Sequence, residues 1–246
     1  MTNSLCWIIT WNMETTTTLL KFEVSKLFSL LIENIMHRSR SRKLMQFYKF
    51  LKPKDNDKIL EVGVANHEYS SVDNFLIKKY PYPENITVLS IGDLSEFQKK
   101  YPAVKAITYD GKLFPFENKT FDITHSNAVI EHVGHFEEQR LFLKEIVRVS
   151  KRGMISTPNK YFPIEIHTRV PLLHLCPKNI FEKYLNLIGK SWATGDYMNL
   201  LSKKEIDKLM KQTVVKNYKI IKNRFLGMTM TFSVIWWSNY LPKCKS

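Results

Sequence analysis

Glycine is scarce in this sequence. The 246 residues include eight glycines, and only Gly63 falls in the stretch KILEVGVANHEYSS, Lys58 to Ser71. That stretch begins like the first strand and turn of a nucleotide-binding domain, whose turn usually needs several glycines. No Gly-x-Gly-x-x-Gly pattern is present anywhere, which disfavours a dinucleotide-dependent oxidoreductase. The three cysteines (Cys6, Cys176 and Cys244) are widely spaced and form no metal or disulfide pattern, so we expect a reducing, cytoplasmic compartment.

Long apolar runs and acidic residues are also few. No apolar run reaches the ~18 residues of a membrane-spanning helix, and the opening MTNSLCWIITWNM lacks the basic start and cleavage site of a signal peptide. The 23 acidic residues face 37 Lys and Arg, which gives a formal net charge of +14. This charge is compatible with an anionic partner, and equally with lysines dispersed over solvated faces. Only HRSRSRK, His37 to Lys43, is a true basic cluster.

A strongly amphipathic helix precedes this basic cluster. Its apolar residues recur at helical spacing: Leu20, Val24, Leu27, Leu31 and Ile35. One interpretation is a helix packed on the main domain, and the other is a basic helix at an anionic inner-membrane surface. We expect residues 1–44 to form an N-terminal helical extension with the basic cluster, and residues 45–246 to form one domain.

Short β-rich runs alternate with helical stretches from Lys58 onward. Five runs predict strands: KILEVG, ITVLSIG, VKAITYD, FDITHSN and GMISTP. The chain then ends with two further strand-like runs, NYKIIKNRF and MTMTFSVIWW, close enough to form an antiparallel hairpin. The sequence therefore predicts an α/β fold: a doubly wound seven-stranded sheet, mostly parallel with a C-terminal antiparallel strand pair, and helices on both faces.

Acidic residues follow the first three predicted strands. Glu61, Asp93 and Asp110 each lie where a strand ends, and in a doubly wound sheet ligands bind at the carboxyl ends of the strands. One carboxylate can accept both ribose hydroxyls, and another can accept an exocyclic amine. Each aspartate taken alone is also typical of a turn or a helix cap.

Four stretches, in this order and at these spacings, resemble the class I S-adenosylmethionine-dependent methyltransferases of the small-molecule type: ILEVG, DGKLFPFENKTFD, SNAVIEHV and LKEIVRVSKRGMISTPN. The resemblance extends over Lys58 to Asn159 and loosely to the final strand pair. It implies methyl transfer from S-adenosyl-L-methionine to a small-molecule or glycan-precursor acceptor, with oxygen as the expected target atom. Arg169 and the positive net charge favour an anionic acceptor, and the basic cluster His37 to Lys43 favours peripheral contact with an anionic membrane surface.

The resemblance also implies which residues bind the cofactor: Glu61, Gly63, Ala65, Asp93, Asp110, Gly111 and Asn127. Glu61 and Gly63 match the family's first motif, whereas Ala65 and His67 replace its second and third glycines. Asp93 is the expected ribose ligand, and Asp110 the expected partner of the adenine amine. Because Ala65 and His67 replace glycines, an alternative stays open: the chain is a degenerate, non-catalytic member of the fold that serves as an interaction module.

Histidines are the expected proton acceptors. His132 follows Glu131 after the fourth strand, and His167 lies in the proline-rich segment TPNKYFPIEIHTRVPLLHLCP. The same segment supplies the expected acceptor-binding residues Asn159, Tyr161, Glu165 and Arg169. We expect no metal. An RNA methyltransferase is the remaining alternative because of the charge, but the signature of amino-group methylation and an RNA-binding module are missing.

Overall fold

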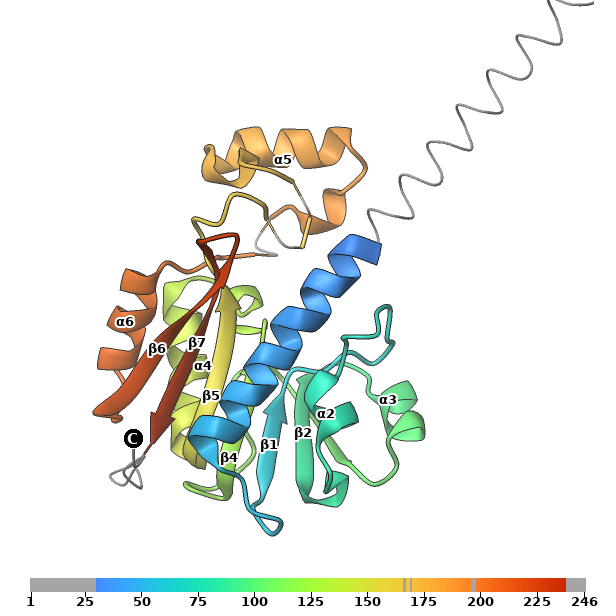
Figure 1. Ribbon diagram of the computed structural model, residues 1–246, viewed down its shortest axis with the longest axis vertical. Coiled ribbons are helices and arrows are strands. Elements are labelled where there is room, and N and C mark those ends of the chain that lie inside the picture. Colours follow the sequence, from blue (N-terminus) through green and yellow to red (C-terminus); the bar gives the residue numbers. More distant parts are fainter. Residues whose placement is uncertain (1–29, 166, 169, 196–197, 238–246) are drawn as a thin grey trace, which may run out of the picture.

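The computed structural model describes residues 30–165, 167–168, 170–195 and 198–237. Its centre is a seven-stranded sheet of order β3-β2-β1-β4-β5-β7-β6 (Figure 1). The strands are β1 (Ile59–Val62), β2 (Ile86–Ile91), β3 (Lys105–Tyr109), β4 (Phe121–Asn127), β5 (Ser150–Pro158), β6 (Asn217–Phe225) and β7 (Met228–Trp237). The first five are parallel, while β7 pairs antiparallel with both β5 and β6. The predicted sheet is therefore confirmed.

Helices cover both faces of this sheet. One face carries α4 (Phe136–Val149) and α6 (Lys203–Lys211), and the other carries α2 (Phe75–Lys79), α3 (Ser95–Lys100) and the N-terminal helix, 30–46 (Figure 1). The N-terminal helix ends in a π-helical turn, Phe47–Leu51. In the part of the chain that the structure describes, no helix is long and apolar enough to cross a membrane.

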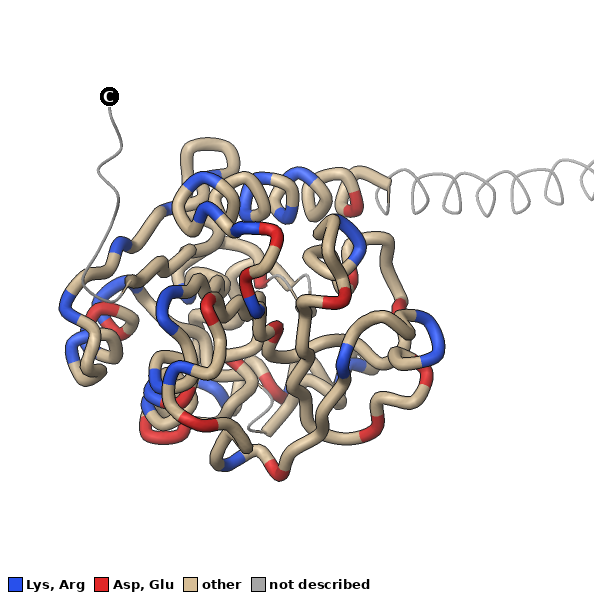
Figure 2. The backbone as a smooth tube through the Cα atoms, turned by 90° about the horizontal axis from the view of Figure 1, so that it is seen from below, with Lys and Arg blue, Asp and Glu red and all other residues tan. Residues whose placement is uncertain are grey.

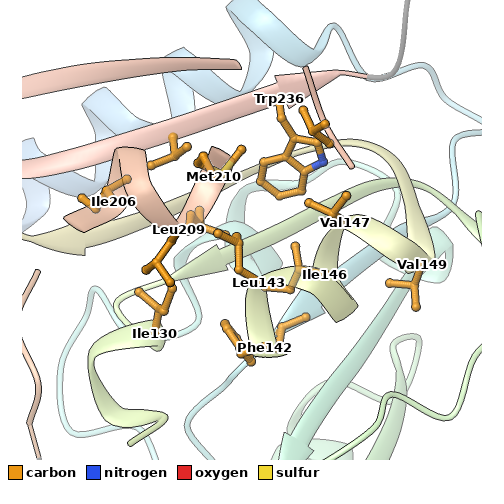
Figure 3. Packing of buried hydrophobic residues seen from close by; sticks show 14 of the residues in the cluster. Ile130, Phe142, Leu143, Ile146, Val147, Val149, Ile206, Leu209, Met210 and Trp236 are labelled. Atoms are coloured by element: carbon orange, nitrogen blue, oxygen red, sulfur yellow. The ribbon is translucent and has the colours of Figure 1, made fainter. Parts of the chain in front are cut away.

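Alternation along the strands divides the core into two layers. In β1, Leu60 and Val62 pack with α4 and α6, whereas Ile59 packs with Phe47 and α2 on the opposite face. Figure 3 shows the first layer, in which α4, α6 and Trp236 of β7 meet. A Cβ at Gly153 would lie 2.3 Å from the Trp236 ring, so this close packing requires glycine there.

A segment of short helices lies beyond the carboxyl ends of β4 and β5 (Figure 1). It contains the short 3-10 helices Leu173–Leu175 and Ser191–Ala193, with α5 (Lys178–Leu187) between them. Val170, Leu185 and Ala193 form a small apolar cluster of its own. The segment is therefore a cap with an apolar cluster of its own, placed over the edge at which β4 and β5 end.

Two local features differ from the sequence pattern. The pattern of SVDNFLIKKY, residues 71–80, is typical of a helix over its whole length, but the α-helix begins only at Phe75, because Asn74 takes a left-handed conformation with φ 51°. The N-terminal helix carries the residues of the basic cluster within its described turns, and it packs on the sheet through Leu44, Phe47 and Leu51. The predicted residues 20–29 of this helix lie outside the described part, and the boundary at residue 44 stays a prediction.

Candidate functional site

The turn after β1 requires its single glycine. Gly63 has φ 81°, and an added Cβ would lie 2.4 Å from Cγ2 of Val129, in the loop after β4. The Gly63 N–H donates to the carbonyl of Leu89 at 2.9 Å, which fixes the turn to the end of β2. The absence of a side chain therefore lets two loops of the sheet edge meet.

An asparagine holds the turn where the other glycines are missing. Asn74 Oδ1 accepts from the N–H of Ala65 at 3.0 Å, and Asn74 Nδ2 donates to the Ala65 carbonyl at 2.9 Å. Asn74 Nδ2 also donates to Glu68 at 3.0 Å. Burial would raise the pKa of Glu68, but hydrogen bonds from Lys100, Lys78 and Tyr101 outweigh it and hold this pKa at about 2. A side-chain clamp thus sets the turn's shape. His67 is exposed and does not line the cavity described next.

A cavity of about 530 Å³ lies between this turn, the loop after β4 and the N-terminal helix. Six residues expected at a site from the sequence line it: Glu61, Gly63, Ala65, Asn127, His132 and His167. The N-terminal helix contributes four residues that the sequence reasoning missed: Met36, Arg40, Lys43 and Leu44. These residues are separated by four, three and one positions in the sequence, which places them on one face of a helix. This helical spacing is the sequence signal that could have grouped them.

Two basic side chains from that helix line the cavity, Lys43 buried and Arg40 partly exposed. Lys43 is 7% exposed and donates to Asn127 Oδ1 at 3.1 Å, while Ser156 Oγ donates to the same oxygen. Burial, assisted by the charge of Arg40, lowers the pKa of Lys43 to about 7. Burial also lowers the pKa of Arg40, against the opposing charges of Asp73, Glu61 and Glu131. The cavity therefore presents desolvated cationic groups.

The carboxylate of Glu61 is buried beneath the same cavity. Its Oε2 lies 2.6 Å from Nδ1 of His125 on the neighbouring strand β4. His125 in turn packs edge-on against Phe47, with ring centroids 5.5 Å apart. Glu61 is thus held in place by a side chain of the sheet and keeps its position at the cavity.

The remaining expected cofactor residues lie beside this cavity. Asp93 accepts from the Ser95 hydroxyl at 2.7 Å, from the Ser95 N–H at 3.0 Å, and from Asn66 at 3.2 Å. The Ser95 hydrogen bonds lower the pKa of Asp93. Asp110 accepts from the Lys112 N–H at 3.0 Å, and Gly111 follows it with φ 82°. All three are exposed at the ends of β2 and β3 and do not line the 530 Å³ cavity.

Apolar side chains flank these aspartates. Ile91 at the end of β2 is 65% exposed, and Leu113 after β3 is 72% exposed. A Cβ built on Gly111 would lie 3.6 Å from Ile91, so the two strand ends adjoin. Exposed apolar groups next to hydrogen-bonded carboxylates form an open shelf, and a flat base can stack on such a shelf.

Two histidines from distant segments meet on the far side of the cavity. Nε2 of His132 lies 3.2 Å from Nε2 of His167, with the rings nearly perpendicular at 83°. Oε1 of Glu131 lies 3.8 Å from Nε2 of His167, and Oε2 of Glu131 accepts from the Thr157 hydroxyl at 3.0 Å. Glu131 is fully buried, and its Oε1 has no hydrogen-bond partner in the described part of the chain.

Glu165 orients His167 from the cap side. Its Oε1 lies 2.9 Å from Nδ1 of His167 and accepts from the His167 N–H at 2.8 Å, and its Oε2 accepts from Thr168. Burial would lower the pKa of His167, but the hydrogen bond to Glu165 and the charge of Glu131 outweigh it and raise this pKa. Burial alone would raise the pKa of Glu165, but its hydrogen bond from His167 lowers it to about 2.

A second cavity of about 370 Å³ lies under the cap. Glu165 lines it, whereas His167 lines the first cavity. Its other polar lining residues come from α4, α5, α6 and the connecting loops, and they include Gln139, Lys160, Lys178, Glu182 and Glu205. The hydrogen-bonded pair Glu165–His167 therefore lies where the two cavities approach each other.

The other expected acceptor residues lie elsewhere. Asn159 donates to the Thr229 carbonyl at 2.8 Å and accepts from the Tyr161 N–H at 3.2 Å, so it fixes the strand-to-cap turn. The Tyr161 side chain is exposed and lines neither cavity. Arg169 lies outside the described residues. Of the three expected acceptor residues that the structure describes, it brings only Glu165 to a cavity.

Comparisons with known proteins agree with this geometry. Residues 85–155 match the methyltransferase domain family. No match was found among curated protein sequences. The fold is similar to the CurJ carbon methyltransferase, at 13% identity and TM-score 0.51; the match covers 79% of this chain and 51% of that one, so this chain spans about half of its length.

Two further solved structures share the fold. One is a methyltransferase from Aquifex aeolicus described as SAM-dependent, at 14% identity and TM-score 0.50, with 80% of this chain and 88% of that chain covered. The other is the N-terminal domain of EvdMO1 in the presence of S-adenosylhomocysteine (SAH) and D-fucose, at 14% identity and TM-score 0.51. That match covers 81% of this chain and 83% of the other. The chain therefore carries a match to the methyltransferase domain over residues 85–155, and its sheet has the fold of these solved methyltransferases.

Proposed function

We propose that this enzyme transfers a methyl group from S-adenosylmethionine to a hydroxyl or carboxyl oxygen of a small molecule or glycan precursor. The observation that carries this proposal is the meeting of two cavities at the Glu165–His167 pair. Methyl transfer is an in-line displacement, so donor and acceptor must approach from opposite sides of one point. Two cavities that approach each other beside a histidine supply such an arrangement.

The larger cavity is proposed to take the methionine end of the cofactor. Arg40 is cationic there, and a bound carboxylate would favour the charged form of Lys43, so both suit the methionine carboxylate, and Glu61 suits the ammonium group. The adenosine would extend onto the open shelf. Asp93 would accept the ribose hydroxyls and Asp110 the adenine amine, with Gly111 beside the base. Asn127 completes the cavity wall after β4.

The smaller cavity is proposed to take the acceptor. Its size suits a sugar-sized molecule. Its lysines pair with glutamates, Lys160 with Glu205 and Lys178 with Glu182, and such polar pairs can hydrogen-bond sugar hydroxyls. EvdMO1, a structural neighbour, was solved with a sugar present. Arg169, Tyr161 and Asn159 stay in the proposal as residues of the same segment, with Asn159 acting through the turn that it holds.

His132 and His167 are proposed to promote loss of the acceptor proton. As the oxygen–methyl bond forms and the methyl–sulfur bond breaks, S-adenosylhomocysteine leaves and the hydroxyl proton must depart. His167 faces the cofactor cavity and is oriented by Glu165. We further place the enzyme in the cytoplasm. Contact with an anionic membrane would depend on the exposed outer face of the N-terminal helix.

Calorimetry and turnover test the proposal together. Wild-type protein should bind S-adenosylhomocysteine, and His167→Ala should reduce methylation of glycan-precursor extracts by a larger factor than it reduces that affinity. A protein that binds no cofactor at millimolar ligand would instead be a non-catalytic module. Robust methylation of bulk RNA, with small-molecule extracts inert, would show an RNA methyltransferase. Figure 2 shows Lys and Arg interspersed with Asp and Glu in that view, which disfavours RNA.

A further inference from the structure

The geometry points to a divalent transition-metal site formed by Glu131, His132 and His167 at the junction of the two cavities. This inference rests on the proposed function and deepens it, because it assigns the way in which the two histidines assist the acceptor. The sequence predicts no metal, because Asn127 and Ala128 stand where a further carboxylate would help. His167 is 35 residues from His132, and the fold brings them together.

Three ligand atoms converge on one point. The Nε2 atoms of His132 and His167 are 3.2 Å apart. Bonds of about 2.1 Å from one cation to both would enclose an angle of about 100°. Oε1 of Glu131 is 3.8 Å from His167 Nε2, and the three ligand atoms lie within 4.8 Å of one another. A shift of roughly 1 Å by a side chain would bring all three within bonding distance of a cation.

The buried carboxylate is an independent sign of a ligand. Glu131 is fully buried, yet its Oε1 has no hydrogen-bond partner among the described residues, whereas its Oε2 is bound by Thr157. A buried carboxylate oxygen without a donor is costly. It points toward the histidine Nε2 atoms, so a cation placed among them would satisfy all three ligands at once.

The surrounding contacts are those that a metal ligand needs. Glu165 binds Nδ1 of His167, which leaves Nε2 as the ligand atom, and this carboxylate–histidine arrangement is common around bound metals. Thr157 fixes the Glu131 carboxylate in the same way. His132 and His167 both line the 530 Å³ cavity, so a cation can enter from it.

The donor set indicates the kind of cation. Two imidazoles and one carboxylate favour first-row transition ions such as Zn²⁺, Mn²⁺ or Co²⁺, whereas Mg²⁺ and Ca²⁺ prefer oxygen ligands. Three protein ligands leave a coordination position open. An acceptor hydroxyl bound at that position would lose its proton to solvent more readily, and its oxygen would be held facing the cofactor's methyl group.

Metal titration of the full-length, EDTA-dialysed protein tests the site. By calorimetry we expect one Zn²⁺ per chain, with Mg²⁺ binding at least about tenfold more weakly. Co²⁺ should give a visible absorption spectrum of a nitrogen- and oxygen-ligated site. Glu131→Gln, His132→Ala and His167→Ala should each weaken Zn²⁺ binding at least about tenfold. His67→Ala, which removes an exposed histidine elsewhere, should leave Zn²⁺ binding unchanged.

The outcomes separate this inference from the proposed function. Because Glu131 is buried and its variant can fail to fold, His132→Ala at the cavity wall carries the test by itself, with circular dichroism to check folding. Wild-type protein that binds S-adenosylhomocysteine but no Zn²⁺ overturns the metal site alone. Equal Zn²⁺ affinity in wild type and His132→Ala also overturns it. Zn²⁺ binding without any S-adenosylhomocysteine binding would overturn the proposed function and leave the metal site standing.

Discussion

The ammonium group of Lys43 lies 3.1 Å from Oδ1 of Asn127, and this hydrogen bond ties the N-terminal helix to the end of β4. Lys43 is itself buried and, like Arg40, lines the larger cavity. A desolvated lysine at a cavity wall is poor for stability but well suited to an anionic ligand. Removing the charge of Lys43 should therefore stabilise the fold and weaken the binding of an anionic ligand.

Lys43→Met tests this division. Methionine keeps the length and apolar stem of lysine without its charge, so we expect the free energy of unfolding to stay the same or rise. S-adenosylhomocysteine binding should weaken about tenfold or more, since a charge-assisted hydrogen bond to the methionine carboxylate is lost. Isothermal calorimetry and urea unfolding measure the two effects. Arg38→Met, on the exposed face of the same helix, is the matched control and should change neither.

Lys43 should also make stability depend on pH. Its pKa is about 7 in the folded protein, against an ordinary value of 10.5. Between these values the unfolded chain binds more protons than the folded chain, so this group raises the free energy of unfolding as pH increases from about 7 toward 10. The effect is on the order of a few kcal/mol. Urea midpoints measured across this range should rise more in wild type than in Lys43→Met, and parallel curves would contradict the burial of a titrating lysine.

Asp93→Ala should weaken S-adenosylhomocysteine binding about tenfold or more, because the carboxylate is the proposed acceptor for both ribose hydroxyls. Asp93 also accepts from Ser95 at the start of α3, so thermal unfolding must be measured beside calorimetry. Glu96→Ala, on the same helix and paired with Lys99, is the control. Unchanged affinity with lowered stability would assign Asp93 to helix capping alone.

Gly63→Ala should destabilise the protein by about 1–3 kcal/mol and disturb the cofactor cavity. The added Cβ would lie 2.4 Å from Val129, at a backbone conformation that is already unfavourable for alanine. Gly111→Ala has a similar positive φ but meets Ile91 only at 3.6 Å, so it should cost less. Val129→Ala should restore part of the loss in Gly63→Ala. If the two substitutions lower the free energy of unfolding equally, the loss comes from backbone conformation and not from the contact between the loops.

The sequence by itself determined the sheet. The runs FDITHSN, NYKIIKNRF and MTMTFSVIWW correspond to β4, β6 and β7 residue for residue, because buried strands need apolar and β-branched side chains locally. The sequence also placed Glu61 and Asp93 at strand ends. Parallel strands have their carboxyl ends at the same edge of the sheet, so both residues lie at that edge. Gly63 stood out because it is the only glycine of its turn.

Only the tertiary structure decided how distant segments complete the site. Asn74 replaces the missing glycines through two hydrogen bonds to Ala65, a clamp that no local pattern encodes. Helical periodicity could group Arg40 and Lys43 on one face of a helix. It could not show that this face lies against the ends of β1 and β4. His132 and His167 meet because Glu165 and the cap segment hold one ring against the other. Such contacts depend on the spatial fit of segments far apart in the chain, and neither segment's own composition specifies its partner.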